Sequence, residues 1–172
     1  RDRSVSRGLG DVYKRQFQTY GVEPDIMSLA KGIADGVPMG AVVAKKEIAD
    51  VFKPGDHGST FGGSCLAIAA CAATLSALVR GDYAEHAAKV GAYMEQALAK
   101  LPHVVEARGR GLMLGCDLDD TAGDAHDVVA RALGAGAVIN ATGAHTLRFL
   151  PPLVCEEADV DSLIEILSGV LG

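Results

Sequence analysis

The chain has 172 residues, of which 49% are hydrophobic, and its formal net charge is −6. This length suits one domain or a large part of a two-domain enzyme, and an aromatic content of only 5% predicts an aliphatic core. The negative charge argues against nucleic acid as a partner, because phosphate binding needs clustered Lys and Arg. No apolar run approaches the roughly 20 residues of a membrane span. The four cysteines form no CxxC pair, which predicts reduced thiols in a cytoplasmic protein and no metal site.

Residues 1–16, RDRSVSRGLGDVYKRQ, differ from the rest of the chain. They hold 5 of the 16 basic residues but only 2 of the 22 acidic ones, and they show no hydrophobic period. We interpret them as a non-native or artefactual segment and leave them out of the fold prediction. A natural basic arm is the alternative.

The next part of the chain, residues 17–81, mixes short apolar runs with helical patterns. The run at 25–30 is bounded by Pro24 and by Lys31-Gly32, which predicts a buried strand. The further segments predicted here are a loop at 32–39, a strand at 40–44, a helix at 45–52, a loop at 53–63 and an Ala-rich helix at 64–79. This texture is typical of an α/β domain.

A boundary is predicted near Gly81, and residues 82–172 are expected to form a small α+β domain. The segments predicted here are a helix at 83–101, strands at 104–107 and 112–118 around an Arg-Gly-Arg-Gly turn, a helix at 125–133, strands at 137–140 and 146–150, and a closing helix at 158–171.

Lys31 is the first candidate for chemistry. It follows the apolar run directly and has no charged residue beside it. We expect its amine to be desolvated at the end of a buried strand, which disfavours the ammonium form and frees a nucleophile for Schiff-base chemistry. The alternative is an ordinary loop lysine.

A second candidate is the segment HGSTFGG at 57–63, which carries the hydroxyls of Ser59 and Thr60 just before the Ala-rich helix. Glycines, hydroxyls and a helix start can together bind a phosphate or a carboxylate. The segment is not a P-loop, because no Gly-Lys-Ser/Thr follows. A glycine turn with a Ser/Thr cap is the alternative.

Arg148 is the third candidate, at the end of an apolar strand. We expect it to be largely buried, and therefore to need a carboxylate from a substrate or from an internal salt bridge. Arg108 and Arg110 flank a glycine turn and are interpreted as structural. The acidic residues at 117–124 fit no EF-hand spacing and are interpreted as a solvated turn.

Four segments, taken in order, resemble the class-III aminotransferases, pyridoxal-phosphate-dependent enzymes of fold type I. They are YGVEPDIMSLAKGIADGVPMGAVVA at 20–44, HGSTFGG at 57–63, RGRGLMLGCDL at 108–118 and LRFLPPL at 147–153. Among the subgroups, the acetylornithine and ornithine aminotransferases are the most similar. The resemblance implies that 17–81 is the C-terminal part of the cofactor-binding large domain and that 82–172 is the small C-terminal domain.

The resemblance also implies a role for each candidate. Lys31 matches the lysine that holds pyridoxal 5′-phosphate covalently and later moves the substrate proton. Thr60 matches the residue that reaches the cofactor phosphate of the neighbouring subunit in a homodimer, and Ser59 is similar to a substrate-contacting position. Arg148 matches the arginine that binds the α-carboxylate of the amino-acid substrate.

Two departures from the family pattern stand out. Ser64-Cys65 replaces the usual Asn-Pro at the helix start, where Ser64 could still act as the cap. The family's aspartate to the pyridine nitrogen, its glycine-rich phosphate turn and its ring-stacking aromatic residue lie upstream of Phe17 and are not found. We therefore expect a C-terminal fragment that is inactive by itself.

The implied activity is transfer of an amino group between N-acetylornithine, or a close ω-amino relative, and 2-oxoglutarate in arginine biosynthesis. One alternative is a 4-aminobutyrate or other ω-amino-acid transaminase. An alternative of another class is a non-catalytic binding module or inactive relic.

Overall fold

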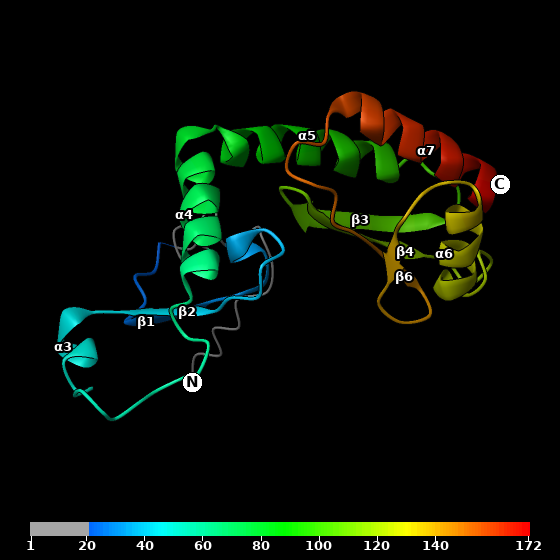
Figure 1. The fold of residues 1–172 in the computed structure, drawn as a ribbon. Helices are drawn as coiled ribbons and strands as arrows, with labels where there is room; N and C mark the ends of the chain where they lie inside the picture. Colours follow the sequence, from blue (N-terminus) through cyan, green and yellow to red (C-terminus); the bar gives the residue numbers. More distant parts are fainter. Residues whose placement is uncertain (1–20) are drawn as a thin grey trace. The chain divides into compact units, whose positions relative to one another are not determined.

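The computed structural model describes residues 21–172, so the segment 1–16 lies outside the described residues. The chain divides into two compact units between Asp82 and Tyr83 (Figure 1). Each unit mixes helices with an antiparallel sheet, which agrees with the predicted α/β class.

The first unit is built on a two-stranded sheet. Strand β1 (Ile26–Leu29) pairs with β2 (Ala41–Ala44), and a 3-10 helix, η1 (Lys31–Ala34), lies between them in the chain. Two helices follow, the short α3 (Lys46–Ala49) and the long α4 (Cys65–Arg80). Helix α4 packs on η1, and the buried cluster there consists of Ile33, Ala34 and Cys71.

Two predictions for this unit are wrong. Strand β1 is not buried: its residues alternate between exposed and half-buried, and Ile26 is 52% exposed. A continuous apolar run favours a strand covered on both faces, but the described sheet has only two strands. The helix predicted at 45–52 ends at Ala49, and Val51 and Phe52 beyond it are exposed, so they give the helix no apolar face to bury.

The second unit packs helices against one face of a four-stranded antiparallel sheet of order β3-β4-β6-β5 (Figure 1). Its strands are β3 (Val104–Arg110), β4 (Met113–Leu118), β5 (Asn140–Ala141) and β6 (Thr146–Phe149). Its helices are α5 (Tyr83–Leu98), α6 (Ala125–Gly134) and α7 (Glu157–Leu171). Helix α5 contacts β3 and β4, α6 contacts β5 and β6, and α7 packs on α5 and α6.

The core of the second unit follows from the two periods of the sequence. Every second residue of β4 is buried, from Leu114 to Leu118, and α5 buries residues three or four apart, including Val90 and Met94. Gly91 lets α5 approach the β3–β4 hairpin, since a Cβ on this residue would lie 1.9 Å from the Gly111 carbonyl oxygen. The hairpin and the helix are therefore in backbone contact.

Side-chain caps begin three of the helices. The hydroxyl of Ser64 accepts a hydrogen bond from the Ala67 amide, which confirms the predicted cap of α4. Asp124 accepts from the His126 amide at the start of α6. Glu156 and Asp159 form a reciprocal capping box at α7.

Two strand predictions need correction. The predicted Arg-Gly-Arg-Gly turn at 108–111 is mostly strand, because β3 runs to Arg110 and only Gly111 and Leu112 connect it to β4. The strand predicted at 137–140 forms only at Asn140–Ala141, since pairing with β6 begins there.

Within residues 21–172, no single helix is long and apolar enough to cross a membrane. Helices α4 and α5 reach that length and composition only when taken together across a 70° bend.

The contact between Gly91 and Gly111 makes a prediction for stability. Gly91→Ala should destabilise the chain by about 1–3 kcal/mol, because the added methyl group has no space, although Ala by itself favours a helix. Gly169→Ala in α7 is the matched control, since a Cβ there meets nothing within 4 Å. Urea unfolding monitored by circular dichroism measures both, and equal effects of the two changes would contradict the close-contact explanation.

Candidate functional site

Lys31 lies at the point where β1 ends and η1 begins. Its backbone has a φ of 58°, a left-handed conformation that L residues rarely adopt. Holding such a conformation costs on the order of 1–3 kcal/mol, and such residues cluster at functional sites. The side chain is exposed and has no ion pair within residues 21–172, whereas Lys45 pairs with Asp25 at 2.8 Å.

The expected desolvation of Lys31 is therefore wrong for this structure, because the described sheet beside it has only two strands and does not cover the amine. The backbone conformation, which the sequence does not reveal, provides a different reason to single out this residue. It fixes the direction in which the chain leaves β1.

The segment 57–63 leads into the N-terminus of α4. Gly62 donates its amide hydrogen to the Ser59 carbonyl oxygen at 3.3 Å, and a Cβ at Gly62 would lie 2.9 Å from that of Ser59, so the turn requires glycine here. Ser59 and Thr60 are exposed, and their hydroxyls make no hydrogen bond in the described part of the chain. These hydroxyls are available to a ligand or a partner.

Arg148 lies in β6, opposite Gly115 of β4 and Asn140 of β5. Its neighbours Leu147 and Phe149 enter the core, so the alternation of the strand directs Arg148 to the other face, where it is exposed. The expectation of a largely buried arginine is wrong for this reason. No hydrogen bond or ion pair involves Arg148 among the described residues, so the internal salt bridge left open by the sequence is not formed there.

The predicted site residues belong to two different units. Lys31, Ser59 and Thr60 belong to the first unit, and no hydrogen bond connects Lys31 to either hydroxyl residue within residues 21–172. Arg148 belongs to the second unit. The roles of the four residues therefore stay predictions.

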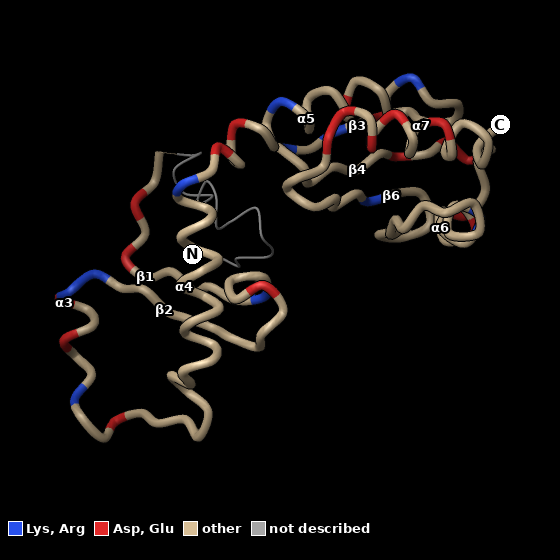
Figure 2. The backbone as a smooth tube through the Cα atoms, turned by 45° about the horizontal axis from the view of Figure 1, so that its top comes forward, with Lys and Arg blue, Asp and Glu red and all other residues tan. Residues whose placement is uncertain are grey.

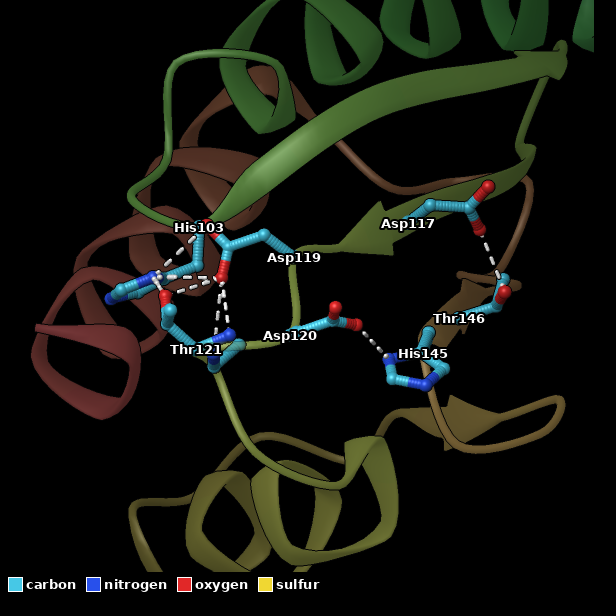
Figure 3. A network of polar contacts seen from close by, with 8 residues as sticks. His103, Asp117, Asp119, Asp120, Thr121, His145 and Thr146 are labelled. Carbon is cyan, nitrogen blue, oxygen red and sulfur yellow. Dashed lines mark hydrogen bonds and ion pairs between the residues drawn. The ribbon is translucent and has the colours of Figure 1, made fainter.

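A polar network at one end of the second sheet was not predicted (Figure 3). His103 lies 3.3 Å from Asp119, which also accepts hydrogen bonds from the backbone and side chain of Thr121. His145 approaches Asp120 at 3.9 Å. The carboxylates of the acidic turn therefore hold nearby side chains and backbone amides by hydrogen bonds and ion pairs. His103 and His145 are distant in sequence from their carboxylate partners, so only the fold reveals these two contacts.

Asp117 is the second centre of this network. It accepts two hydrogen bonds from the Arg108 guanidinium, at 2.6 and 3.0 Å, and one from the Thr146 hydroxyl at 2.6 Å. Arg108 first, and Thr146 next, hold the pKa of Asp117 below its usual range. The side chain of Thr121 does the same for the pKa of Asp119.

No metal centre is found among residues 21–172, and the buried Cys116 is a poor candidate for a nucleophile. No group of three or more His, Cys, Asp and Glu side chains there could hold a metal ion. Burial raises the pKa of the Cys116 thiol to about 12, which makes it a poor nucleophile at neutral pH. The remaining chemistry lies with exposed amine, hydroxyl and guanidinium groups and with the exposed thiol of Cys65.

Comparison with known proteins places the chain in a family. The sequence profile of the family described as "Aminotransferase class-III" matches residues 10–171. The chain belongs to the class-III aminotransferase family.

Three similar proteins illustrate this relationship. The chain is 45% identical to the acetylornithine aminotransferase of Caldanaerobacter subterraneus subsp. tengcongensis, over 97% of this chain and 43% of that protein. Its fold is similar to an ornithine aminotransferase from Toxoplasma gondii, whose structure reveals partial PLP occupancy at the active site, with a TM-score of 0.84, 33% identity, and coverage of 95% and 40%. An (S)-enantioselective omega-transaminase from Thermomicrobium roseum has a TM-score of 0.82 at 32% identity, with coverage of 95% and 41%.

The chain thus spans less than half the length of these relatives. The family match and the fold similarity confirm the resemblance described from the four sequence segments.

The lowered pKa of Asp119 makes a prediction for pH dependence. A carboxylate whose pKa is lower in the folded state stabilises the fold above its unfolded pKa of about 3.9, and this contribution is lost as pH falls through the folded value. Asp119→Asn should therefore destabilise the chain at pH 7, and the difference from the unchanged chain should shrink as pH falls below about 4.

Denaturant midpoints at pH 7 and pH 3 check this expectation. Asp120→Asn is the matched control, because the side chain of Asp120 is 99% exposed and lies 3.9 Å from His145, its only ion-pair partner within residues 21–172. An equal loss for Asp119→Asn at both pH values would show that charge is not the cause.

Proposed function

We propose that this chain provides the lysine and the carboxylate-binding arginine of a cytoplasmic pyridoxal-phosphate-dependent aminotransferase. The reaction moves an amino group between N-acetylornithine, or a close ω-amino relative, and 2-oxoglutarate, and it serves arginine biosynthesis. The observation that carries the proposal is Lys31, an exposed amine without a carboxylate partner in residues 21–172, on a left-handed backbone at the end of a strand. The 45% identity to an acetylornithine aminotransferase supports the choice of substrate.

The available donor groups fit pyridoxal 5′-phosphate. Its aldehyde reacts with a neutral amine, and a carboxylate partner would favour the ammonium form instead. Lys31 has no carboxylate partner in the described chain. The cofactor phosphate needs hydrogen-bond donors beside a helix start, and the hydroxyls of Ser59 and Thr60 precede α4. When bound, this cofactor supplies an electron sink for the bonds at the substrate carbon that bears the transferred amino group.

Each residue then has a defined task. The Nζ atom of Lys31 binds the cofactor and moves the proton of the substrate carbon that bears the transferred amino group. The Oγ1 atom of Thr60 donates to the cofactor phosphate of the neighbouring subunit in a homodimer. Ser59 contacts the substrate beside it. The Arg148 guanidinium binds the substrate α-carboxylate through two parallel hydrogen bonds.

A second candidate is a 4-aminobutyrate or other ω-amino-acid transaminase, which the similarity to the Thermomicrobium roseum omega-transaminase favours. Competition between amino donors separates the two, because specificity is the ratio of their kcat/KM values. N-acetylornithine should be preferred over 4-aminobutyrate.

Lys31 can be tested without an activity assay. When the chain is incubated with pyridoxal 5′-phosphate and reduced with borohydride, mass spectrometry should find the adduct mainly on Lys31, and Lys31→Ala should remove it. Lys100 is the matched control, since it is also exposed and its side chain has no hydrogen bond or ion pair in the described residues. Equal labelling of Lys31 and Lys100 would support the alternative of a non-catalytic module.

A further inference from the structure

The sheet of the second unit has one face without helices in that unit. The strand alternation and register place a set of mostly polar residues on it: Glu106, Arg108 and Arg110 from β3, Met113, Gly115 and Asp117 from β4, Asn140 from β5, and Thr146 and Arg148 from β6. Arg148 is the only charged residue of β6, and the blue position on that strand in Figure 2 marks it. One row crosses all four strands, in the order Arg108, Gly115, Arg148 and Asn140.

In the described chain, the carboxylates on this face pair with one of its arginines and not with the others. Both of its carboxylates contact Arg108: Asp117 at 2.6 Å and Glu106 at 3.4 Å. Asp117 is held further by Thr146, so its two oxygens accept three hydrogen bonds. Arg148 is two residues from Thr146 on the same face, yet it has no carboxylate partner in residues 21–172. The arrangement leaves its positive charge unneutralised.

Gly115 separates the two arginines of the row. A Cβ there would be in ordinary contact, 3.4 Å from the Leu147 carbonyl oxygen and 3.8 Å from the Thr146 methyl group, and its φ is not in the left-handed region. Gly109 on the neighbouring strand differs, because a Cβ there would lie 2.3 Å from the Met113 carbonyl oxygen. Packing therefore requires glycine at 109 but not at 115. A glycine inside a strand weakens the strand, and it often marks a bulge, a tight bend or the close approach of a ligand or another backbone.

We propose that Arg108 and Gly115 are positioning residues for a carboxylate ligand of Arg148: Arg108 keeps Asp117 away from Arg148, and Gly115 keeps the space between the two arginines open. The ligand class is a carboxylate of an amino or oxo acid, which Arg148 grips with both of its terminal nitrogens. This inference rests on the proposed function of Arg148 and adds two residues to it.

The backbone spacing supports the role of Gly115. Arg108 and Arg148 lie two strands apart, which is about 10 Å at a spacing of about 4.8 Å per strand. A carboxylate bound to Arg148 must lie in the space between the two arginines, which the side chain at position 115 would also occupy. A β-branched residue suits a strand but would stand beside the guanidinium and obstruct the ligand.

The test is a titration of the whole chain with glutarate at 0.15 M salt, with glutaramide as the uncharged comparison. Binding is read from the side-chain Nε–Hε NMR signal of Arg148. Arg108→Leu should weaken glutarate binding roughly threefold to fivefold, because the released Asp117 then pairs with Arg148 at the strength of an exposed ion pair. Arg108→Leu with Asp117→Asn should restore binding, since the competing carboxylate is gone.

Arg110→Leu is the matched control for Arg108→Leu. It removes the same charge from the same strand, but Arg110 has no carboxylate partner in the described chain to release. It should change binding by less than about twofold at this salt concentration. Equal effects of the two changes, or no restoration in the double variant, would overturn the role of Arg108.

Gly115→Val should raise thermal stability or leave it unchanged, while weakening glutarate binding about tenfold through loss of the paired hydrogen bonds. Binding as tight as in the unchanged chain would overturn the role of Gly115. If the unchanged chain shows no glutarate response at Arg148, the whole inference fails. Borohydride trapping on Lys31 would be unaffected by that result, so the two failures can be told apart.

Discussion

The antiparallel register between β4 and β6 determines most of the second unit. It pairs Cys116 with Leu147, and both are buried, so the same register brings Gly115 beside Arg148 on the opposite face. A slip of one residue in β6 would turn its side chains to the opposite faces and would expose its apolar residues. The hydrophobic effect therefore fixes the position of a guanidinium that takes no part in the core. This coupling explains how a polar face can be placed accurately by contacts on the other side of the sheet.

On that polar face, one ion pair keeps a carboxylate from pairing with Arg148. A sheet that presents three arginines and two carboxylates could form several ion pairs, and exposed pairs are individually weak. In the structure, Asp117 accepts two hydrogen bonds from Arg108 and one from the Thr146 hydroxyl, and these bonds hold it beside Arg108. Arg110 and Arg148 remain without a carboxylate partner among the described residues, and Arg148 is the one that lies beside Gly115. In a family that handles amino and oxo acids, such a residue suits a carboxylate.

Much of this organisation could be predicted from the sequence. The long helices, the cap at Ser64 and the alternation in β4 follow local rules, and the structure confirms them. The environment of Lys31 and Arg148 was predicted wrongly, because an apolar run indicates burial only if other elements cover it, and pattern alone does not count those elements. The left-handed backbone of Lys31 and the pairing of Arg108 with Asp117 depend on chain direction and register, which local composition does not encode. Residue types indicated which side chains could carry chemistry, whereas the contacts of those side chains could be read only from the folded structure.

The two buried clusters differ greatly in size, and this difference has a dynamic consequence. The cluster beneath η1 contains three buried residues, whereas the cluster of the second unit contains twenty among those described. Local opening has a low free energy where few apolar contacts must be broken. Backbone amides around Lys31 should therefore exchange with solvent deuterium much faster than those of β4 and β6. The strand end that carries the lysine would be rigid only when something else covers it, so order there would report on binding.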